Sequence, residues 1–224
     1  ALRAAIAEAK PGDAILLHGC CHNPTGIDYS PAQWDEIAPL VAEAKLLPIL
    51  DLAYQGLGKG MEEDAYGVRR VLAEVPEALI AYSCDKNFGM YRDRVGAIYV
   101  LAENAEVLGR VLSNGHALAR AAWSMPPDHG GAAVRLILED PALTAMWLDE
   151  LDSMRTRMSQ VRARLAAAGQ QGGVDFTPLG SQNGLFSIVP LSSEQIQQLR
   201  TDHGIYMAGS GRINAAGLTM ANID

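Results

Sequence analysis

The sequence of 224 residues has no surplus of positive charge: 18 Lys and Arg residues stand against 26 Asp and Glu, and the formal net charge is -8. Such a chain has no basic face for a polyanion, so any anion it binds needs a local site. No apolar run approaches the ~20 residues that cross a bilayer, and the first residues lack the order of a signal peptide. We therefore expect no nucleic-acid partner, no membrane and a cytoplasmic location.

Cysteine is also scarce, with three residues, of which Cys20 and Cys21 are neighbours. Adjacent cysteines close a disulfide only with strain, which indicates a reducing compartment. His18 and His22 flank the pair, and both residue types bind zinc. Alternation along an extended segment would send neighbouring side chains to opposite faces, and no second cluster completes a closed site. We therefore predict no metal.

Hydrophobic residues make up 49% of the chain, and up to about residue 98 short apolar runs alternate with helical patterns. This order predicts an α/β fold, with a mostly parallel sheet and crossover helices. The expected strands are Ala14–His18, Leu46–Leu50 and Leu79–Ser83, with Val95–Val100 as an edge or antiparallel strand. The expected helices are one capped by Ser30, which Pro39 should bend or shorten, and another over Asp64–Val75.

Beyond these strands the chain is mainly helical. Helices are expected over Glu103–Ala122, Asp128–Leu138 and Pro141–Ala168, the last with an apolar stripe. A small α+β lobe should follow, with a helix over Ser193–Asp202 and strands over Gly184–Val189, Gly204–Ala208 and Arg212–Ala215. We predict a domain boundary at residue 140: residues 1–140 belong to a large domain, and residues 141–224 form a connecting helix and a small domain.

Polar side chains follow the predicted strands. Asn23, Asp51, Tyr54, Ser83 and Lys86 all come where an apolar run ends. Ligands of open α/β sheets bind at the carboxyl ends of strands, so these residues are candidates for one site. A neutral lysine amine forms an imine with an aldehyde. Asp51 suits either a cationic ring nitrogen or the cap of the next helix.

Two arginines suit anionic groups. A guanidinium makes forked, charge-assisted bonds, so Arg94 together with Ser83 could hold a phosphate. The alternative for Arg94 is an ion pair with Asp93 or Asp85. Arg212 could bind a substrate carboxylate, or it is an ordinary arginine at a strand end.

Several motifs now join in one resemblance. They are HNPTG at 22–26, DLAYQG at 51–56, SCDKNFG at 83–89, RVG at 94–96 and SGRIN at 210–214. In this order and spacing the chain resembles the aspartate and aromatic amino-acid aminotransferases, class I enzymes of fold-type I that use pyridoxal 5'-phosphate. The resemblance implies that residues 1–140 are the C-terminal part of the large cofactor-binding domain. It also implies amino transfer from an L-amino acid, aspartate or aromatic, to a 2-keto acid such as 2-oxoglutarate.

The resemblance further implies roles around the cofactor ring. Lys86 would bind the cofactor aldehyde and carry the substrate proton as general base and acid. Asp51 would pair with the pyridine nitrogen and keep it protonated. Asn23 and Tyr54 would hydrogen-bond the phenolic oxygen, and Asn23 would also face the substrate.

The remaining implied roles concern anions. Ser83 and Arg94 would hold the cofactor phosphate, and Arg212 the α-carboxylate of the substrate. Arg120 would reach into the site of a second subunit and bind the side chain of a dicarboxylate, which implies a homodimer with shared sites. Its alternative is a polar residue on a helix surface.

The chain also departs from the family pattern. Asp85 stands beside the lysine where the family usually has a small residue, and it would favour the charged amine unless its carboxylate points away. Met125 replaces a position that is often polar in the aspartate-specific enzymes, which is compatible with aromatic substrates. The preceding part of the family sequence and a short C-terminal piece have no counterpart here, so we expect the isolated chain to be inactive. The alternatives are a non-catalytic, partner-binding relic of the fold and another pyridoxal reaction such as β-elimination.

Overall fold

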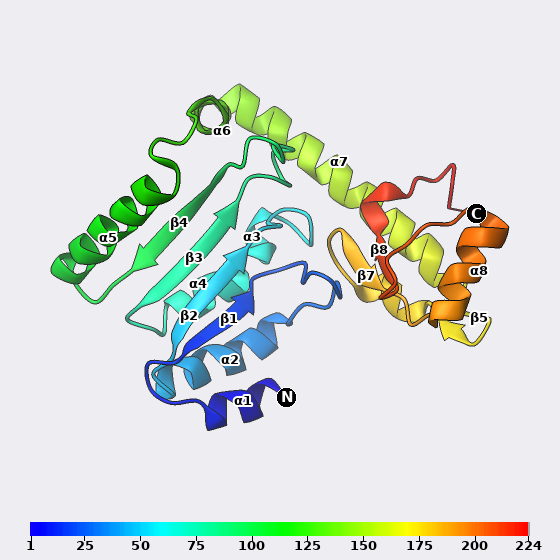
Figure 1. Ribbon diagram of the computed structural model, residues 1–224, viewed down its shortest axis with the longest axis horizontal. Helices are drawn as coiled ribbons and strands as arrows, with labels where there is room; N and C mark the ends of the chain where they lie inside the picture. Colours follow the sequence, from blue (N-terminus) through cyan, green and yellow to red (C-terminus); the bar gives the residue numbers. More distant parts are fainter. Residues whose placement is uncertain (224) are drawn as a thin grey trace.

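A computed structural model describes residues 1–223 (Figure 1). The helices are α1 (Leu2–Glu8), α2 (Pro31–Glu43), α3 (Met61–Asp64), α4 (Tyr66–Leu72), α5 (Ala105–Trp123), α6 (His129–Glu139), α7 (Pro141–Ala166) and α8 (Ser193–His203). The strands are β1 (Ala14–His18), β2 (Leu47–Leu52), β3 (Ala78–Ser83), β4 (Gly96–Leu101), β5 (Gln170–Gln171), β6 (Val174–Asp175), β7 (Phe186–Ile188) and β8 (Arg212–Asn214). Two 3-10 turns cover Thr177–Ser181 and Ala215–Gly217.

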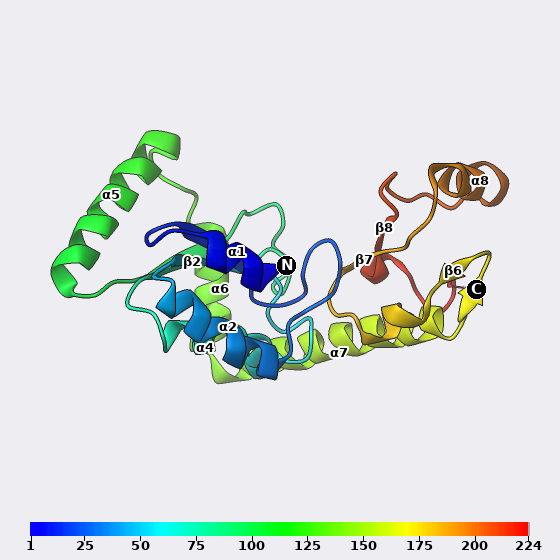
Figure 2. The same ribbon diagram turned by 90° about the horizontal axis from the view of Figure 1, so that it is seen from below.

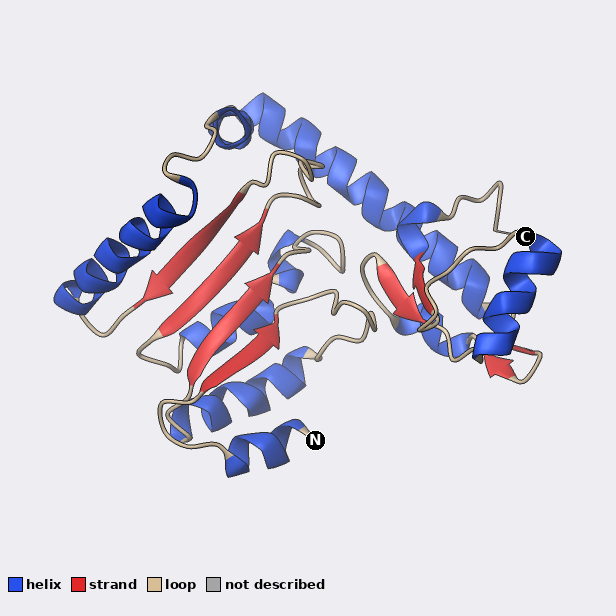
Figure 3. Ribbon diagram, viewed as in Figure 1, coloured by secondary structure: helices blue, strands red, loops and turns tan. Residues whose placement is uncertain are grey.

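The main sheet has four strands in the order β1-β2-β3-β4. The first three strands are parallel, and β4 pairs antiparallel with β3. Figure 3 shows the helices and loops that connect these strands. The predicted α/β class, with a mostly parallel sheet, is confirmed. Strand β2 extends beyond the predicted end, so Asp51 lies within the strand, opposite His18 of β1 and Ala81 of β3.

Helices cover the two faces of the sheet unequally. Helices α2 and α4 lie on one side and α5 on the other (Figure 2). Leu17 and Leu50 are buried in the core, whereas Leu16 and Ile98 are 63% and 70% exposed. Because successive side chains of a strand point to opposite faces, this pattern marks one covered and one open face.

The capping box predicted at Ser30 is confirmed. The Ser30 hydroxyl accepts a hydrogen bond from the Gln33 backbone N–H, and the Gln33 side-chain oxygen accepts one from the Ser30 backbone N–H. Of the two effects predicted for Pro39, the shortening is wrong, because α2 continues to Glu43, and the bend stays a prediction. A proline removes only one N–H group from the helix, and burial of neighbouring Trp34 and Ile37 holds it in place.

Two further predictions are wrong. The helix expected over Asp64–Val75 is present only as α4 over Tyr66–Leu72. Asp64 instead ends the separate helix α3, where its side chain folds back onto the preceding loop, and Pro76 disfavours a helical Val75. Residues 204–208, all of them described, form no strand; Tyr206 is 77% exposed there, so no packing supports one.

Helix α7 connects the sheet to the C-terminal elements (Figure 1). These elements include the two-stranded sheets β5-β6 and β7-β8 and helix α8. The domain boundary at residue 140 stays a prediction, and Asp224, at the end of the predicted second domain, lies outside the described residues. Among residues 1–223 no helix has the length and apolar character needed to cross a membrane.

Candidate active site

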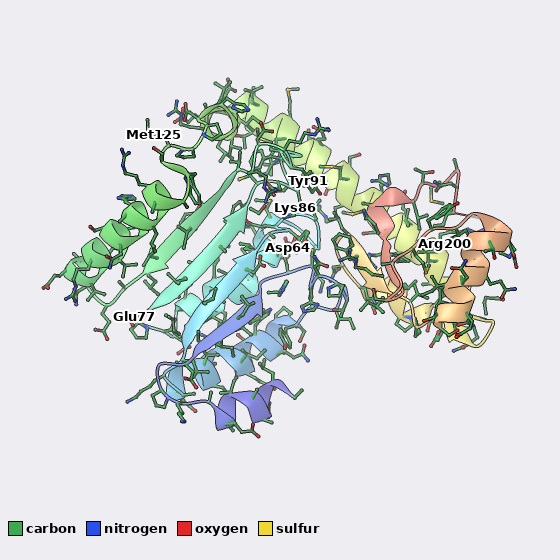
Figure 4. All side chains as sticks on the ribbon, in the orientation of Figure 1. Asp64, Glu77, Lys86, Tyr91, Met125 and Arg200 are labelled. Atoms are coloured by element: carbon green, nitrogen blue, oxygen red, sulfur yellow. The ribbon has the colours of Figure 1, made fainter. Side chains whose placement is uncertain are left out.

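The candidate residues gather at the carboxyl ends of the parallel strands. Asp51 is the penultimate residue of β2, and Ser83 is the final residue of β3. Figure 4 shows Lys86, just beyond β3, in the region that faces α7 and the C-terminal elements. Neighbouring parallel strands end at the same edge of the sheet, which is why Asp51 and Ser83 come together although they are far apart in sequence.

A chain of contacts links four of the candidates. The Asn23 side-chain amide donates a hydrogen bond of 3.2 Å to the hydroxyl of Tyr54. The Lys86 amine lies 5.2 Å from the centre of the Tyr54 ring, and it donates a hydrogen bond of 3.3 Å to Ser83 Oγ. An amide, a phenol, an amine and a hydroxyl thus lie in one series of contacts.

Two further candidates, Asp51 and Arg212, are close enough to Tyr54 to affect its pKa. Burial raises this pKa above its ordinary value, while the hydrogen bond from Asn23 lowers it. The negative charge of Asp51 also raises it, and the positive charge of Arg212 lowers it. Asp51 is half-buried, and among the described residues no side chain donates a hydrogen bond to its carboxylate.

Asp85 and Arg94 form an ion pair beside Lys86. Arg94 also donates a hydrogen bond of 3.0 Å to the Tyr91 carbonyl, and its backbone is left-handed, with φ of 55°. The Asp85 carboxylate therefore points to Arg94 and not to the lysine. Of the two ion pairs considered for Arg94, the structure contains the one with Asp85.

Arg212 begins β8, on the C-terminal side of the site. Its guanidinium lies 5.1 Å from the centre of the Phe186 ring. The segment that carries Phe186 is held against the loop after β1, because the Asn183 N–H donates a hydrogen bond of 2.8 Å to the Gly26 carbonyl. The loop that carries Asn23 is therefore joined through the backbone to the segment before β7, the strand that pairs with β8.

Arg162 of α7 supports the same junction and was missed in the sequence. Its buried guanidinium donates hydrogen bonds of 2.5 Å to Ser187 Oγ and 2.7 Å to the Gly184 carbonyl. Burial lowers its pKa. An arginine beside Val161, on the apolar stripe of a long helix, was the available signal.

Arg120 and Met125 are not brought to Lys86 within this chain. Helix α5, all of whose residues are described, contains no buried residue. Arg120 lies in its last turn and is exposed. Figure 4 shows Met125 well apart from Lys86, and Met125 is 81% exposed.

Cys20 and Cys21 lie on the same side of the backbone, which corrects the expected alternation. A positive φ of 51° at Cys21 breaks the extended pattern, and both thiols approach Asp64, with ligand atoms within 4.8 Å of one another. The Asp64 carboxylate already accepts hydrogen bonds from the N–H groups of Gly56, Gly58 and Lys59. This carboxylate therefore organises the loop after β2.

The chain resembles characterised proteins along its whole length. A family model described as aminotransferase class I and II matches residues 1–224. The tyrosine aminotransferase of Rhizobium meliloti (strain 1021) is 52% identical over 220 residues, which are 98% of this chain and 57% of that protein. The aspartate aminotransferase of Escherichia coli (strain K12) is 44% identical over 225 residues, 100% of this chain and 57% of that protein.

Solved structures show the same relationship. The aromatic-amino-acid aminotransferase from Burkholderia pseudomallei, covalently bound to pyridoxal phosphate, is 40% identical with a TM-score of 0.93. The match covers 99% of this chain and 56% of that one. The chain therefore spans little more than half the length of these relatives. Because the family pattern extends from residue 1 to residue 224, this chain belongs to the class I and II aminotransferases.

Proposed function

We propose that the complete protein carrying this chain is a pyridoxal-phosphate-dependent aminotransferase. It transfers the amino group of an L-amino acid, aspartate or aromatic, to a 2-keto acid such as 2-oxoglutarate. The observation that carries this proposal is the chain of contacts from Asn23 through Tyr54 and Lys86 to Ser83. The names of the relatives, which include tyrosine, aspartate and aromatic-amino-acid aminotransferases, support the substrate range.

The residues present fit the cofactor chemically. Asp51 offers a half-buried carboxylate without a donor among the described side chains, as a protonated ring nitrogen requires. Asn23 and Tyr54 offer hydrogen bonds for a phenolate, and Ser83 with Arg94 offers a hydroxyl and a guanidinium for a phosphate. When bound, pyridoxal phosphate supplies an aldehyde that exchanges nitrogen with amino acids and a ring that accepts electrons from the substrate carbon.

The protein side chains divide the remaining work. Lys86 Nζ would be the nucleophile toward the aldehyde. Once displaced by the amino acid, the neutral amine would take the α-proton of the substrate and deliver that proton to the cofactor. Its hydrogen bond to Ser83 orients the amine in the absence of a ligand. Arg212 binds the α-carboxylate of the substrate, and the Phe186 ring beneath its guanidinium limits its orientations.

We further propose a cytoplasmic homodimer in which two subunits share each site. Arg120 would act in the partner's site, where it would bind the side-chain carboxylate of a dicarboxylic substrate. Arg120 is exposed, and helix α5, which carries it, lies apart from Lys86 of the same chain (Figure 4); both observations support this assignment.

The test is covalent trapping on the complete protein. Borohydride reduction in the presence of pyridoxal phosphate should fix the cofactor on the peptide that contains Lys86, and Lys86→Ala should abolish the labelling. Lys59→Ala, at an exposed lysine of the neighbouring loop, is the control and should label normally. The trapped protein should carry label at Lys86 alone; labelling spread over other lysines would contradict the assignment.

A second measurement identifies the reaction. The protein is incubated with amino donors and 2-oxoglutarate, and glutamate and the new keto acid are quantified. Equal amounts of both products support transamination. Release of ammonia and a keto acid without 2-oxoglutarate would instead indicate β-elimination, and covalent cofactor without turnover would indicate a relic of the fold.

A further inference from the structure

Asp85 is a buried carboxylate in the middle of the candidate phosphate site. The residue is 3% exposed. One of its oxygens pairs with the guanidinium of Arg94. The other, Oδ1, is buried and has no hydrogen-bond partner within residues 1–223. Its backbone N–H donates a hydrogen bond of 3.2 Å to Ser83 Oγ, so Asp85 contacts both residues assigned to the phosphate.

A carboxylate in this position depends on its counter-charge. A charged group removed from water is stable only when it is paired or hydrogen-bonded, and loss of one partner of a buried pair is costly. Lys86 does not serve as this partner: among the described residues the carboxylate pairs with Arg94, while the Lys86 amine donates to Ser83. Arg94 is therefore the cation that compensates Asp85. Its own side chain is 73% exposed, so the guanidinium is open to a second anion from solvent.

We propose that Asp85 competes with the cofactor phosphate for Arg94 and thereby lowers the affinity of the protein for pyridoxal phosphate. This inference rests on the proposed function, because it assigns Ser83 and Arg94 to the phosphate. A phosphate at Arg94 would share the guanidinium with Asp85 and would bring a second negative group next to a buried carboxylate. Asp85 is thus an affinity-determining residue of the site and takes no part in the chemistry at Lys86.

The competition makes a selective prediction about two ligands. Pyridoxal 5'-phosphate carries the phosphate, and pyridoxal has the same ring and aldehyde without it. Removal of the Asp85 charge should tighten the binding of pyridoxal 5'-phosphate and leave the binding of pyridoxal unchanged. A general effect on folding or on Lys86 would change both ligands in parallel.

The experiment measures the dissociation constants of both ligands for the cofactor-free complete protein, by equilibrium dialysis at fixed pH and ionic strength. Asp85→Asn keeps the size of the side chain and removes its charge. It should lower the dissociation constant of pyridoxal phosphate by about tenfold or more. A tenfold change is modest for the loss of a close, partly buried negative charge. Asp93→Asn is the matched control: this carboxylate also precedes Arg94 but pairs with His129, and its removal should leave both constants unchanged.

The outcomes separate this inference from the proposed function. Unchanged or weaker binding of pyridoxal phosphate by Asp85→Asn, in a protein whose wild type binds it, overturns the role of Asp85 only. Absence of binding to wild type and to both variants overturns the proposed function itself. If Asp85→Asn does not fold, Asp85→Ser provides the same comparison with a smaller neutral side chain, and the same two results decide it.

Discussion

The indole N–H of Trp147 donates a hydrogen bond of 2.8 Å to the carbonyl oxygen of Asn87, the residue that follows Lys86. The Trp147 ring also stacks on Phe88, with the ring centres 4.3 Å apart. Asn87 itself is 1% exposed, and its side-chain amide donates to the Tyr82 hydroxyl at 2.9 Å. Helix α7 therefore anchors the loop that carries the proposed nucleophile.

We expect Trp147→Phe to loosen this loop. The substitution removes the indole donor and leaves an aromatic ring near Phe88, so the free energy of unfolding should fall by about 1 kcal/mol. Pyridoxal phosphate should bind severalfold more weakly, because Lys86 is less well positioned. Denaturant unfolding and ligand titration check the two effects. Trp123→Phe, at an exposed site on α5, should change neither, and a normal affinity in Trp147→Phe would contradict the anchoring role.

Gly67, the glycine of α4, packs so closely against Trp34 that a side chain cannot be added without displacing the indole ring. A Cβ atom on Gly67 would lie 2.1 Å from the indole ring of Trp34 on α2. We expect Gly67→Ala to destabilise the protein by about 2 kcal/mol, because the two helices must separate. Gly115→Ala, in an open position on α5, should instead be neutral or stabilise by up to about 1 kcal/mol. Denaturant unfolding should show a loss of stability for Gly67→Ala and none for Gly115→Ala; equal losses would refute the packing argument.

Asp64→Ala should destabilise the loop between β2 and α3. The buried carboxylate accepts three backbone N–H groups, at 2.8 to 2.9 Å, which would lose their acceptor. We expect a loss of about 3 kcal/mol in the free energy of unfolding. Glu62→Ala removes an exposed carboxylate that pairs with Arg69 and should cost far less, because an ion pair on the surface contributes little to stability. Similar losses in the two variants would show that the Asp64 hydrogen bonds contribute little.

Tyr54 predicts a dependence of stability on alkaline pH. Burial raises its pKa in the folded protein, whereas the unfolded phenol ionises near pH ~10. The folded state therefore keeps the proton longer than the unfolded state does, so the contribution of Tyr54 to stability falls as pH rises above about 10. The free energy of unfolding should decline less steeply between about pH 9 and pH 11 in Tyr54→Phe than in wild type. Parallel declines would contradict the raised pKa.

Arg120→Ala tests the proposed shared site. Loss of a guanidinium that binds a carboxylate should lower kcat/KM for aspartate by about tenfold or more, with little change for an aromatic donor. Arg110→Ala, on the same helix and next to Glu106, is the control and should leave both substrates unaffected. Undiminished aspartate turnover in Arg120→Ala would show that this arginine does not bind the substrate side chain. The assay requires the complete protein, in which both proposed subunits are present.

Much of the large sheet could be predicted from sequence because its strands are short apolar runs with polar residues at their ends. The predicted strand Ala14–His18 agrees with β1 at both ends. The predicted strand Val95–Val100 differs from β4 by one residue at each end. Predictions were weakest where local propensity had no tertiary support. Apolar residues at 204–208 suggested a strand, but no neighbouring strand pairs with this segment within the described part of the chain.

The sequence alone determined the family and the set of candidate residues, because reactive groups at fixed spacings are a property of the chain itself. Only the tertiary structure decided where the Asp85 carboxylate points, that Cys20 and Cys21 face one way, and that Arg162 of α7 binds residues 183–187. The physical reason is the same in each case. A buried charge or donor must have a partner, and this partner, like the local backbone angles, depends on residues distant in sequence that no local pattern encodes.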